Sequence, residues 1–315
     1  PHIAVISGIG WDHVNVFPTF DNYTEQFRIF VDTIENEGCL IYDDNDLEAK
    51  KIAEKASVNK YGYDIHPYIR EDEETYIISN ENKIKIQVFG EHNMKNINAA
   101  YNVCKQIGIS DEVFYNAIST FKGASRRLEL LFENKERNNL IFRDFAHAPS
   151  KVLATVKALR EQYNDRYFLV VFELHTYSSL SEVFIDKYKN CLDNCDKAVV
   201  FYDPHAVAIK KLDMMTDERI IKGFAREDIK VVHSKAELMD LLKDVAPHRV
   251  TSPESRSANI TMILHISRNN TYTILESRSA NITMILHISR NNTYTILESR
   301  SANITMILHI SRNNT

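Results

Sequence analysis

The sequence predicts an α/β protein with two successive sheet domains and a repetitive, β-prone tail. Short apolar runs alternate with amphipathic, helix-like runs over residues 1–121, and the same alternation returns over residues 122–250. From residue 254 onward, a unit of 22 residues occurs twice without a change and then begins a third time. We therefore expect domains at 1–121 and 122–250 and a tail at 251–315.

The first domain reads as strand, helix, strand, helix, followed by a hairpin and two further helices. Strands are predicted at 2–9 and 39–42, and each precedes a helix, at 23–37 and 46–56. Within residues 68–91, two alternating β-runs flank the turn-rich Ser79–Asn82, which predicts an antiparallel hairpin. The two closing helices are expected to end at Gly108 and to begin after Ser110, because glycine favours helix ends and serine caps helix starts.

The second domain shows a strict alternation of strands and helices after a short hinge at 122–125. Strands are predicted at 140–146, 167–174, 197–203 and 229–233, and helices at 150–163, 182–194 and 235–244. This alternation predicts a doubly wound sheet. In the tail, each repeat reads as strand ITMILHI, turn SRNN and strand TYTIL, so a β-solenoid or meander is one reading. We interpret the perfect repetition instead as an artefact or a disordered segment.

Composition and charge exclude several function classes. The chain is 44% hydrophobic and has a net charge of −5. The last 62 residues, from Glu254, hold six Arg and three Glu, so the residues before Glu254 carry a net charge of −8. An acidic body argues against a nucleic-acid partner. Neither an apolar run of about 20 residues nor a signal segment is present, so we expect a cytoplasmic protein without membrane contact. Because Pro1 leads at once into an apolar strand, we also expect a missing upstream segment.

Polar residues follow several predicted strands at the point where each strand ends. They are Trp11, Asp12 and His13 after the first strand, and Asp144, His147, His175, Asp203 and His205 in the second domain. Open α/β sheets bind ligands at the carboxyl ends of their strands. Carboxylates and imidazoles there, with Arg126 and Arg127 in the hinge, predict a site for a polyanion and a divalent ion. The plainer reading is a set of structural histidines and a solvated basic spot.

Four stretches resemble the Mur ligase family in the family's order. They are SGIGWDH (7–13), GEHNMKNINAAYNV (90–103), FKGASRRLELL (121–131) and RDFAHAPSKVLATVKALR (143–160). The resemblance implies the remainder of a central ATP-binding domain followed by a Rossmann-like carboxy-terminal domain. It also implies an ATP-dependent, Mg²⁺-dependent amide-bond ligase of peptidoglycan synthesis. The implied substrates are UDP-N-acetylmuramate and an amino acid or murein peptide.

The resemblance assigns roles to individual residues of this chain. It implies that His13 binds Mg²⁺ and that His92, Asn93 and Asn96 contact the nucleotide base. It further implies that Arg127 approaches the ATP phosphates and that Asp144 holds the ribose, with His147 beside it. We take Arg127 and His147 as the candidate catalytic residues.

Within the family, DFAHAP, FELHTYSSL (172–180) and FYDPHA (201–206) are similar to the branch that takes UDP-N-acetylmuramate itself. Members of this branch attach either L-alanine or L-alanyl-γ-D-glutamyl-meso-diaminopimelate. Phe145 and Ala146 favour the peptide over L-alanine as the substrate. The L-alanine ligases more often have tyrosine and glycine at these two positions. The sequence does not specify the amine or the oligomeric state.

The chain also departs from the family pattern. The loop GxxxxGK[ST], which wraps phosphates in backbone N–H groups, occurs nowhere in the sequence. Arg143 and Ala148 replace an aspartate and a histidine of the motif around Asp144, and they leave the role of His147 open. We therefore expect this chain alone to be inactive. Two alternatives remain, a non-catalytic binding module and a β-rich assembly protein built on the repeats.

Overall fold

The computed structural model describes residues 1–134, 139–245, 259–264, 272–277, 283–287, 294–299 and 304–308, with side chains described as far as residue 242. The chain divides into two compact units. The first consists of Pro1–Gly123 with Lys157–Tyr163, and the second of Ala124–Val156 with Asn164–Thr315. The first change of unit falls between Gly123 and Ala124, inside the predicted hinge at 122–125.

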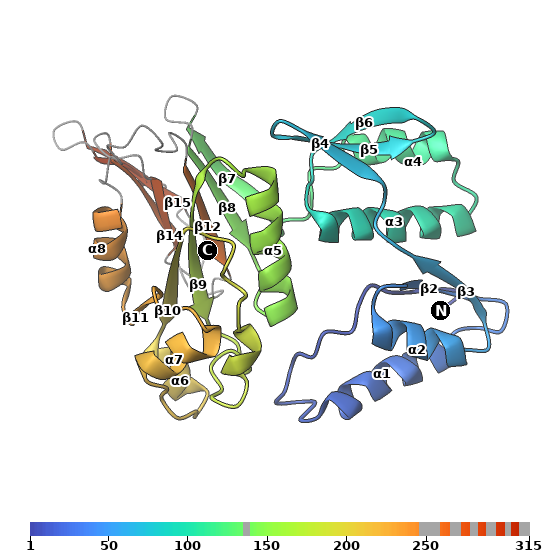
Figure 1. The fold of residues 1–315 in the computed structure, drawn as a ribbon, viewed down its shortest axis with the longest axis horizontal. Helices are drawn as coiled ribbons and strands as arrows, with labels where there is room; N and C mark the ends of the chain where they lie inside the picture. Colours follow the sequence, from blue (N-terminus) through green and yellow to red (C-terminus); the bar gives the residue numbers. More distant parts are fainter. Residues whose placement is uncertain are drawn as a thin grey trace, which may run out of the picture. The chain divides into compact units, whose positions relative to one another are not determined.

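The first unit opens with a parallel three-stranded sheet. Its strands lie in the order β1 (Ile3–Ile6), β2 (Cys39–Asp43) and β3 (Asn59–Tyr63). Helices α1 (Phe20–Asp32) and α2 (Leu47–Lys55) follow β1 and β2 and lie together on one face (Figure 1). Apolar side chains fill the space between this face and the helices: Ala4, Ile6, Ile9, Val31, Ile34, Leu40, Ala49, Ile52, Ala53 and Val58. These residues lie at the strand and helix spacings that define the predicted pattern.

A second sheet in the first unit is antiparallel. It consists of β4 (Tyr68–Glu71), β5 (Glu74–Ser79) and β6 (Asn82–Ile86), with β5 in the centre. Helices α3 (Glu91–Gln106) and α4 (Asp111–Ser119) pack against it around Ile77, Met94 and Phe114. Ala99 of α3 also reaches the core of the parallel sheet beside Ile41 and Tyr63, so α3 contributes to both cores.

Three local predictions for the first unit are confirmed. The hairpin turn between β5 and β6 contains Asn80 and Glu81, whose φ angles of 47° and 68° are those of a primed turn. Ser110 caps α4 by accepting a hydrogen bond from the backbone N–H of Val113 at 3.4 Å. Gly108 follows the end of α3 with a φ of 78°, a conformation that glycine adopts without a steric cost.

The second unit is built on a six-stranded mixed sheet. Its order is β11 (Lys230–Val232), β10 (Lys197–Tyr202), β9 (Tyr167–Leu174), β12 (Asn259–Leu264), β8 (Asn139–Asp144) and β7 (Glu129–Asn134). All neighbours are parallel except β7 and β8, which are antiparallel. The α/β class is confirmed. Every residue of β8 and all but the first of β9 are buried, as expected for strands covered on both faces.

Helical segments cover this sheet. They are α5 (Pro149–Gln162), the 3₁₀ turn η1 (Ile185–Tyr188), α6 (Pro204–Ile209), α7 (Asp217–Phe224) and α8 (Lys235–Val245). The rings of Phe172, Tyr188 and Phe224 pack together with centroids 5.4 to 6.0 Å apart, which fixes η1 and α7 against β9. On another part of the sheet, Leu238 and Leu242 of α8 pack with Leu169, Val171, Val199, Phe201 and Val232.

The prediction of a helix at 182–194 is wrong. Only Ile185–Tyr188 is helical there, and it forms a 3₁₀ turn. The pattern looked helical because apolar residues recur there every three to four positions. The structure buries all of them: Phe184, Ile185, Tyr188, Cys191 and Leu192. Lys189 leaves the helical region with φ −47° and ψ 126°, and Asn190 has a φ of 64° and donates its N–H to Phe224 O at 3.0 Å. A tertiary contact therefore replaces the next helical hydrogen bond.

Two strands were not predicted. Strand β3 carries four exposed residues before the buried Tyr63, so it lacks an apolar signal. Strand β7 lies in the stretch that was read only as a family motif, and it adds an antiparallel edge to a sheet expected to alternate strictly with helices. Mixed sheets of this kind commonly carry one antiparallel edge strand.

The tail from 251, which we interpreted as an artefact or a disordered segment, contributes several of the described strands. Strand β12, from the first repeat, pairs in parallel with both β8 and β9. Its apolar run suits a position between two buried strands. A separate four-stranded sheet contains β14 (Thr283–His287), β13 (Tyr272–Ser277), β15 (Tyr294–Ser299) and β16 (Ile304–Leu308). The predicted turns of the repeats lie outside the described residues.

Candidate functional site

The first predicted site residue, His13, stands beyond the carboxyl end of β1. Asp12 before it is buried, whereas the His13 side chain is 65% exposed. The backbone N–H of His13 donates to Asp12 Oδ1 at 2.7 Å, and His13 Nε2 lies 3.8 Å from Asp12 Oδ2. His13 has a φ of 55°, which is uncommon for a residue with a side chain. The carbonyl of His13 accepts the N–H groups of Val16 and Phe17, so a turn holds this conformation and presents the imidazole to solvent.

The three residues predicted to contact the base occupy the first turns of α3. Gly90 precedes the helix with a φ of 87°, and the α3 side chains His92, Asn93 and Asn96 follow within two turns. The Asn93 side-chain amide donates to Phe89 O at 2.8 Å, which ties the helix start to the segment between β6 and α3. Asn96 is exposed. His92 Nδ1 is buried and has no hydrogen-bond partner among the described residues.

Burial lowers the pKa of His92 from 6.5 to about 4, so the ring is neutral at pH 7. An unpartnered ring nitrogen on a neutral imidazole can accept or donate one hydrogen bond, depending on its tautomer. The start of α3 therefore offers one imidazole and two carboxamides, the groups that recognise a heterocyclic base through hydrogen bonds.

The shifted pKa of His92 predicts a pH-dependent stability. The unfolded chain binds this proton more tightly than the folded chain, so stability is full above pH 6.5 and falls as the pH drops through 6.5 towards 4. From pH 7 to pH 5 we expect His92 to lower the free energy of unfolding by up to about 2 kcal/mol. Urea unfolding at both pH values should show a smaller drop in His92→Gln, while the exposed His2→Gln keeps the full drop. Equal drops in all three proteins would show that His92 is not the titrating group.

In the second unit, the segment from Ala124 to Leu128 forms a tight loop around Arg127. Arg126 and Leu128 have φ angles of 61° and 45°, two left-handed residues on either side of Arg127. Each such residue costs on the order of 1 kcal/mol or more unless surrounding contacts hold it. The N–H of Arg126 donates to Glu129 Oε2 at 2.8 Å, and the N–H of Phe145 donates to Arg126 O at 3.0 Å. The loop is thus fastened to the end of β8.

Asp144 makes the central contacts of this fastening. Its Oδ2 accepts the N–H of Leu128 at 2.6 Å, and its Oδ1 accepts the N–H of Ala146 at 2.6 Å. Burial raises the pKa of Asp144, and these two hydrogen bonds and the charge of Arg127 act in the opposite direction. Each carboxylate oxygen retains a further lone pair. Asp144 can therefore hold the loop and still accept a hydroxyl from a ligand.

Phe145 joins the two candidate catalytic residues. The Arg127 guanidinium lies over the Phe145 ring, 5.6 Å from its centroid, in a cation–π contact. On the same ring, His147 packs edge-on with centroids 5.2 Å apart, and its Nδ1 lies 2.9 Å from Phe145 O. The structure therefore brings Arg127, Asp144 and His147 together. In the sequence, Phe145 was singled out only as a marker of the family branch, and no pattern along the chain indicated that its ring packs against Arg127.

Further strand-end residues border this group. The register pairs Tyr202 with Leu174, so Asp203 and His175 are the next residues on adjacent strands. Burial, then the charge of Lys210, lowers the pKa of His175 to about 4, against the opposing influence of Asp203. His147 also acts electrostatically on His175. The carboxyl ends of β8, β9 and β10, which are consecutive along the chain, thus all carry polar residues. Lys210 lies outside every motif and was missed by the sequence reading.

Arg143 explains how the chain accommodates one departure from the family motif. Its Nη2 donates to Glu129 Oε2 at 2.7 Å, the same oxygen that accepts the N–H of Arg126. Although burial opposes it, these hydrogen bonds hold the pKa of Glu129 below its usual value. Arg143 therefore supports the loop around Arg127 through the carboxylate of Glu129.

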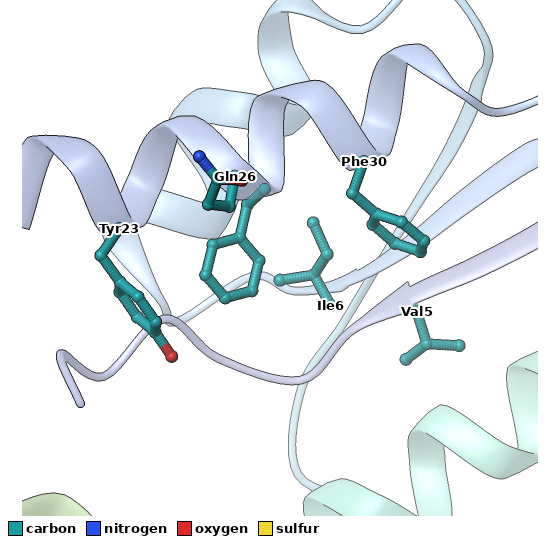
Figure 2. Close-up of a pocket in the computed structure, with 6 residues that line it drawn as sticks. Val5, Ile6, Tyr23, Gln26 and Phe30 are labelled. Atoms are coloured by element: carbon teal, nitrogen blue, oxygen red, sulfur yellow. The ribbon is translucent and has the colours of Figure 1, made fainter. Parts of the chain in front are cut away.

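An apolar pocket of about 230 Å³ lies in the first unit between β1 and α1. Val5, Ile6, Tyr23, Gln26, Phe27 and Phe30 line it, and Figure 2 shows Tyr23 and Phe30 pointing from the helix towards the strand. None of these residues belongs to the predicted site. Within the described residues, no group of three or more His, Cys, Asp and Glu side chains is placed to hold a metal ion. Among the described helices, none has the length and apolarity needed to cross a membrane.

The first unit matches a known family. Residues 1–104 match the family model of the Mur ligase middle domain. This segment is therefore similar to the middle domain of the Mur ligases. UDP-N-acetylmuramate–L-alanine ligase of Carboxydothermus hydrogenoformans is 30% identical over 214 residues, which cover 64% of this chain and 45% of that protein. The same ligase of Aquifex aeolicus is 28% identical, with 64% and 46% covered. The chain spans about half the length of these curated relatives.

Solved structures of Mur ligases share the fold. MurF from Acinetobacter baumannii aligns with a TM-score of 0.64 at 17% identity, covering 92% of this chain and 57% of that one. Murein peptide ligase from Psychrobacter arcticus aligns with a TM-score of 0.54 at 18% identity, with 84% and 54% covered. Folylpolyglutamate synthase from Mycobacterium tuberculosis, complexed with ADP, aligns with a TM-score of 0.62 at 14% identity, with 84% and 60% covered.

Proposed function

We propose that this chain is the base-binding and carboxy-terminal part of an ATP-dependent ligase that joins UDP-N-acetylmuramate to an amino acid or peptide. The observation that carries the proposal is the loop around Arg127. A strained loop that is fastened by Asp144 and Glu129 presents one guanidinium beside the polar strand ends, in a chain whose residues 1–104 match the Mur ligase middle domain. Fixed positive charge next to strand ends suits a phosphate-transfer site.

In this proposal each site residue has one role. His92, Asn93 and Asn96 hydrogen-bond the adenine, and Asp144 accepts a ribose hydroxyl with a free lone pair. Arg127 neutralises the oxygens of the transferring phosphoryl group. His147, held by its contact with the Phe145 carbonyl, orients the ligand beside Arg127.

The chemistry is a two-step amide synthesis. The muramyl carboxylate oxygen attacks the γ-phosphorus of ATP, which forms an acyl phosphate and releases ADP. The amine of the incoming amino acid or peptide then attacks the acyl carbon through a tetrahedral intermediate, and inorganic phosphate leaves as the amide forms. Protein groups mainly position the reactants and neutralise charge.

Mg²⁺ would be held only partly by this chain. His13, with Asp12 behind it, is the ligand that the family resemblance implies, and the described residues supply no larger cluster. Mg²⁺ commonly combines one or two protein ligands with phosphate oxygens and waters. When bound, the ion would offset charge on the phosphates.

The chain has no GxxxxGK[ST] loop, so we propose that it is inactive by itself. The second candidate function is a non-catalytic binding module, which this absence favours. The two candidates differ in whether a protein containing these residues together with an ATP loop turns over ATP.

The amine is a finer part of the proposal. Phe145 and Ala146 favour L-alanyl-γ-D-glutamyl-meso-diaminopimelate, as in the murein peptide ligases. The curated relatives named above favour L-alanine. The peptide stays our proposal from the motifs, and L-alanine is the alternative that the relatives support.

Nucleotide binding tests the proposal on the 315-residue chain itself. We expect calorimetric titration with ADP to show binding, and Asn96→Ala to weaken it about 3- to 12-fold, the effect of one hydrogen bond. Asn116→Ala, an equally exposed asparagine on α4, should bind ADP as the unchanged chain does. Binding of GDP as tight as that of ADP, or an equal loss in both variants, would contradict the assignment of α3 to the base.

A further inference from the structure

The sheet of the second unit has an unusual source for one of its central strands. Strands β8 and β9 follow one another along the chain, yet β12 from the first repeat lies between them. Asn259–Leu264 aligns in parallel with Asn139–Asp144 on one side and with Tyr167–Phe172 on the other. Strand β8 has β7 as its other neighbour, and β9 has β10. The edges of β8 and β9 that face each other are therefore satisfied by β12.

This position needs an occupant. All six residues of β8 and seven of the eight residues of β9 are buried. In this sheet β12 pairs with the facing edges of both strands, and its removal would leave the backbone N–H and C=O groups along those edges without their ladder partners. A parallel strand in such a position is typically an uninterrupted apolar run. ITMIL, with one threonine among four apolar residues, fits this requirement.

The same sequence is present three times. NITMIL occupies 259–264, 281–286 and 303–308 within the repeats. In the first copy it forms the parallel strand β12, whereas in the other copies the shared residues form β14 and β16 in antiparallel pairs with β13 and β15. One sequence thus pairs in parallel and in antiparallel sheets, so it does not itself specify a single partner.

The acceptor strand carries a feature that matches every copy. The Asn139 side chain is buried, and its Oδ1 and Nδ2 have no hydrogen-bond partner among the described residues. The register places the asparagine that opens the repeat strand opposite Asn139. Each of the three copies has this asparagine directly before ITMIL. All three therefore offer the same register to β8.

We propose that the space between β8 and β9 is a strand-acceptor slot and that the three repeats are interchangeable donors for it, within one chain or from a second copy of the chain. A copy further along the chain costs little more to insert, because loop-closure entropy grows only with the logarithm of loop length. Each chain has one slot and three donors, so spare donors remain for the slots of other chains.

Proline substitutions in the repeats test interchangeability in the full chain. Proline removes a ladder donor and is excluded from central strands. We expect Met262→Pro alone to leave hydrogen-exchange protection of residues 140–144 and 168–174 within about 10-fold of the unchanged chain, because another copy enters. The triple variant Met262→Pro, Met284→Pro and Met306→Pro should lose that protection by at least about 100-fold. A full loss in Met262→Pro, or retained protection in the triple variant, would overturn the proposal.

Donation from a second molecule has its own measurement, which also serves if the triple variant folds poorly. The synthetic peptide SANITMILHIS, added during refolding of the triple variant, should restore protection of β8 and β9. The peptide SANITPILHIS is the matched control and should not restore it. Failure of the first peptide, or equal rescue by both, would overturn the acceptor slot without touching the proposed ligase function.

Discussion

Arg127→Ala in the complete ligase is expected to lower kcat by about 100-fold or more, because this guanidinium is assigned to the transferring phosphoryl group. The side chain is exposed and packs over Phe145, so its removal leaves the core intact. Initial rates of phosphate release at saturating ATP measure the effect, and circular dichroism confirms the fold. Lys151→Ala removes an exposed cation from α5 and serves as the control, with an unchanged rate.

A substitution of the neighbouring arginine distinguishes the roles of the two hinge arginines, Arg126 and Arg127. Arg126 contributes its backbone N–H to Glu129, and the cation–π contact with Phe145 belongs to Arg127. We therefore expect Arg126→Lys to reduce kcat by less than about 10-fold. A loss in Arg126→Lys that equals the loss in Arg127→Ala would reject the assignment of Arg127 as the residue that neutralises the phosphoryl group.

Asp144→Asn is the second large effect that we expect. Both carboxylate oxygens accept backbone N–H groups at 2.6 Å, from Leu128 and Ala146. A carboxamide has one acceptor, so in either orientation its NH₂ group faces a backbone donor and one buried N–H loses its partner. We expect the free energy of unfolding to fall by about 1–3 kcal/mol. Urea unfolding measures this change.

The same substitution should also impair the reaction, because Asp144 holds the left-handed Leu128 that directly follows Arg127. We expect kcat to fall by at least about 10-fold. Asp165→Asn changes an exposed aspartate of the second unit and should alter neither quantity. An Asp144→Asn enzyme with normal stability and normal turnover would show that the loop does not depend on this carboxylate.

The parts of the fold that the sequence predicted are those with strong periodic or apolar signals. FLVVFEL and KAVVFY are uninterrupted apolar runs, and both form buried parallel strands. NKYGY has no aliphatic residue and only its last tyrosine is buried, so the sequence did not predict β3, which is defined by its pairing with β2. The run from Glu182 to Asn194 has helical spacing, but the backbone N–H of Asn190 bonds to the carbonyl of Phe224 instead of continuing a helix. A contact with a residue so far along the chain cannot be predicted from the local sequence.

The candidate site shows the same limit. Strand-end polar residues identified Asp144, His147, His175 and Asp203, because parallel strands end at one edge. The support around Arg127 depends on Glu129, Arg143 and the backbone of Leu128, which meet only through pairing of β7 with β8. No pattern along the chain specifies these contacts. The pairing of the repeat strand β12 could likewise not be predicted, because its partners β8 and β9 lie far away in the sequence.

Phosphate release by a protein that contains these residues together with an ATP loop tests the central claim most directly. We expect release to require ATP and UDP-N-acetylmuramate and to be stimulated by an amine, with L-alanyl-γ-D-glutamyl-meso-diaminopimelate more effective than L-alanine. Stimulation by L-alanine alone would replace the peptide by the alternative amine. Phosphate release that does not respond to UDP-N-acetylmuramate would contradict the proposed ligase.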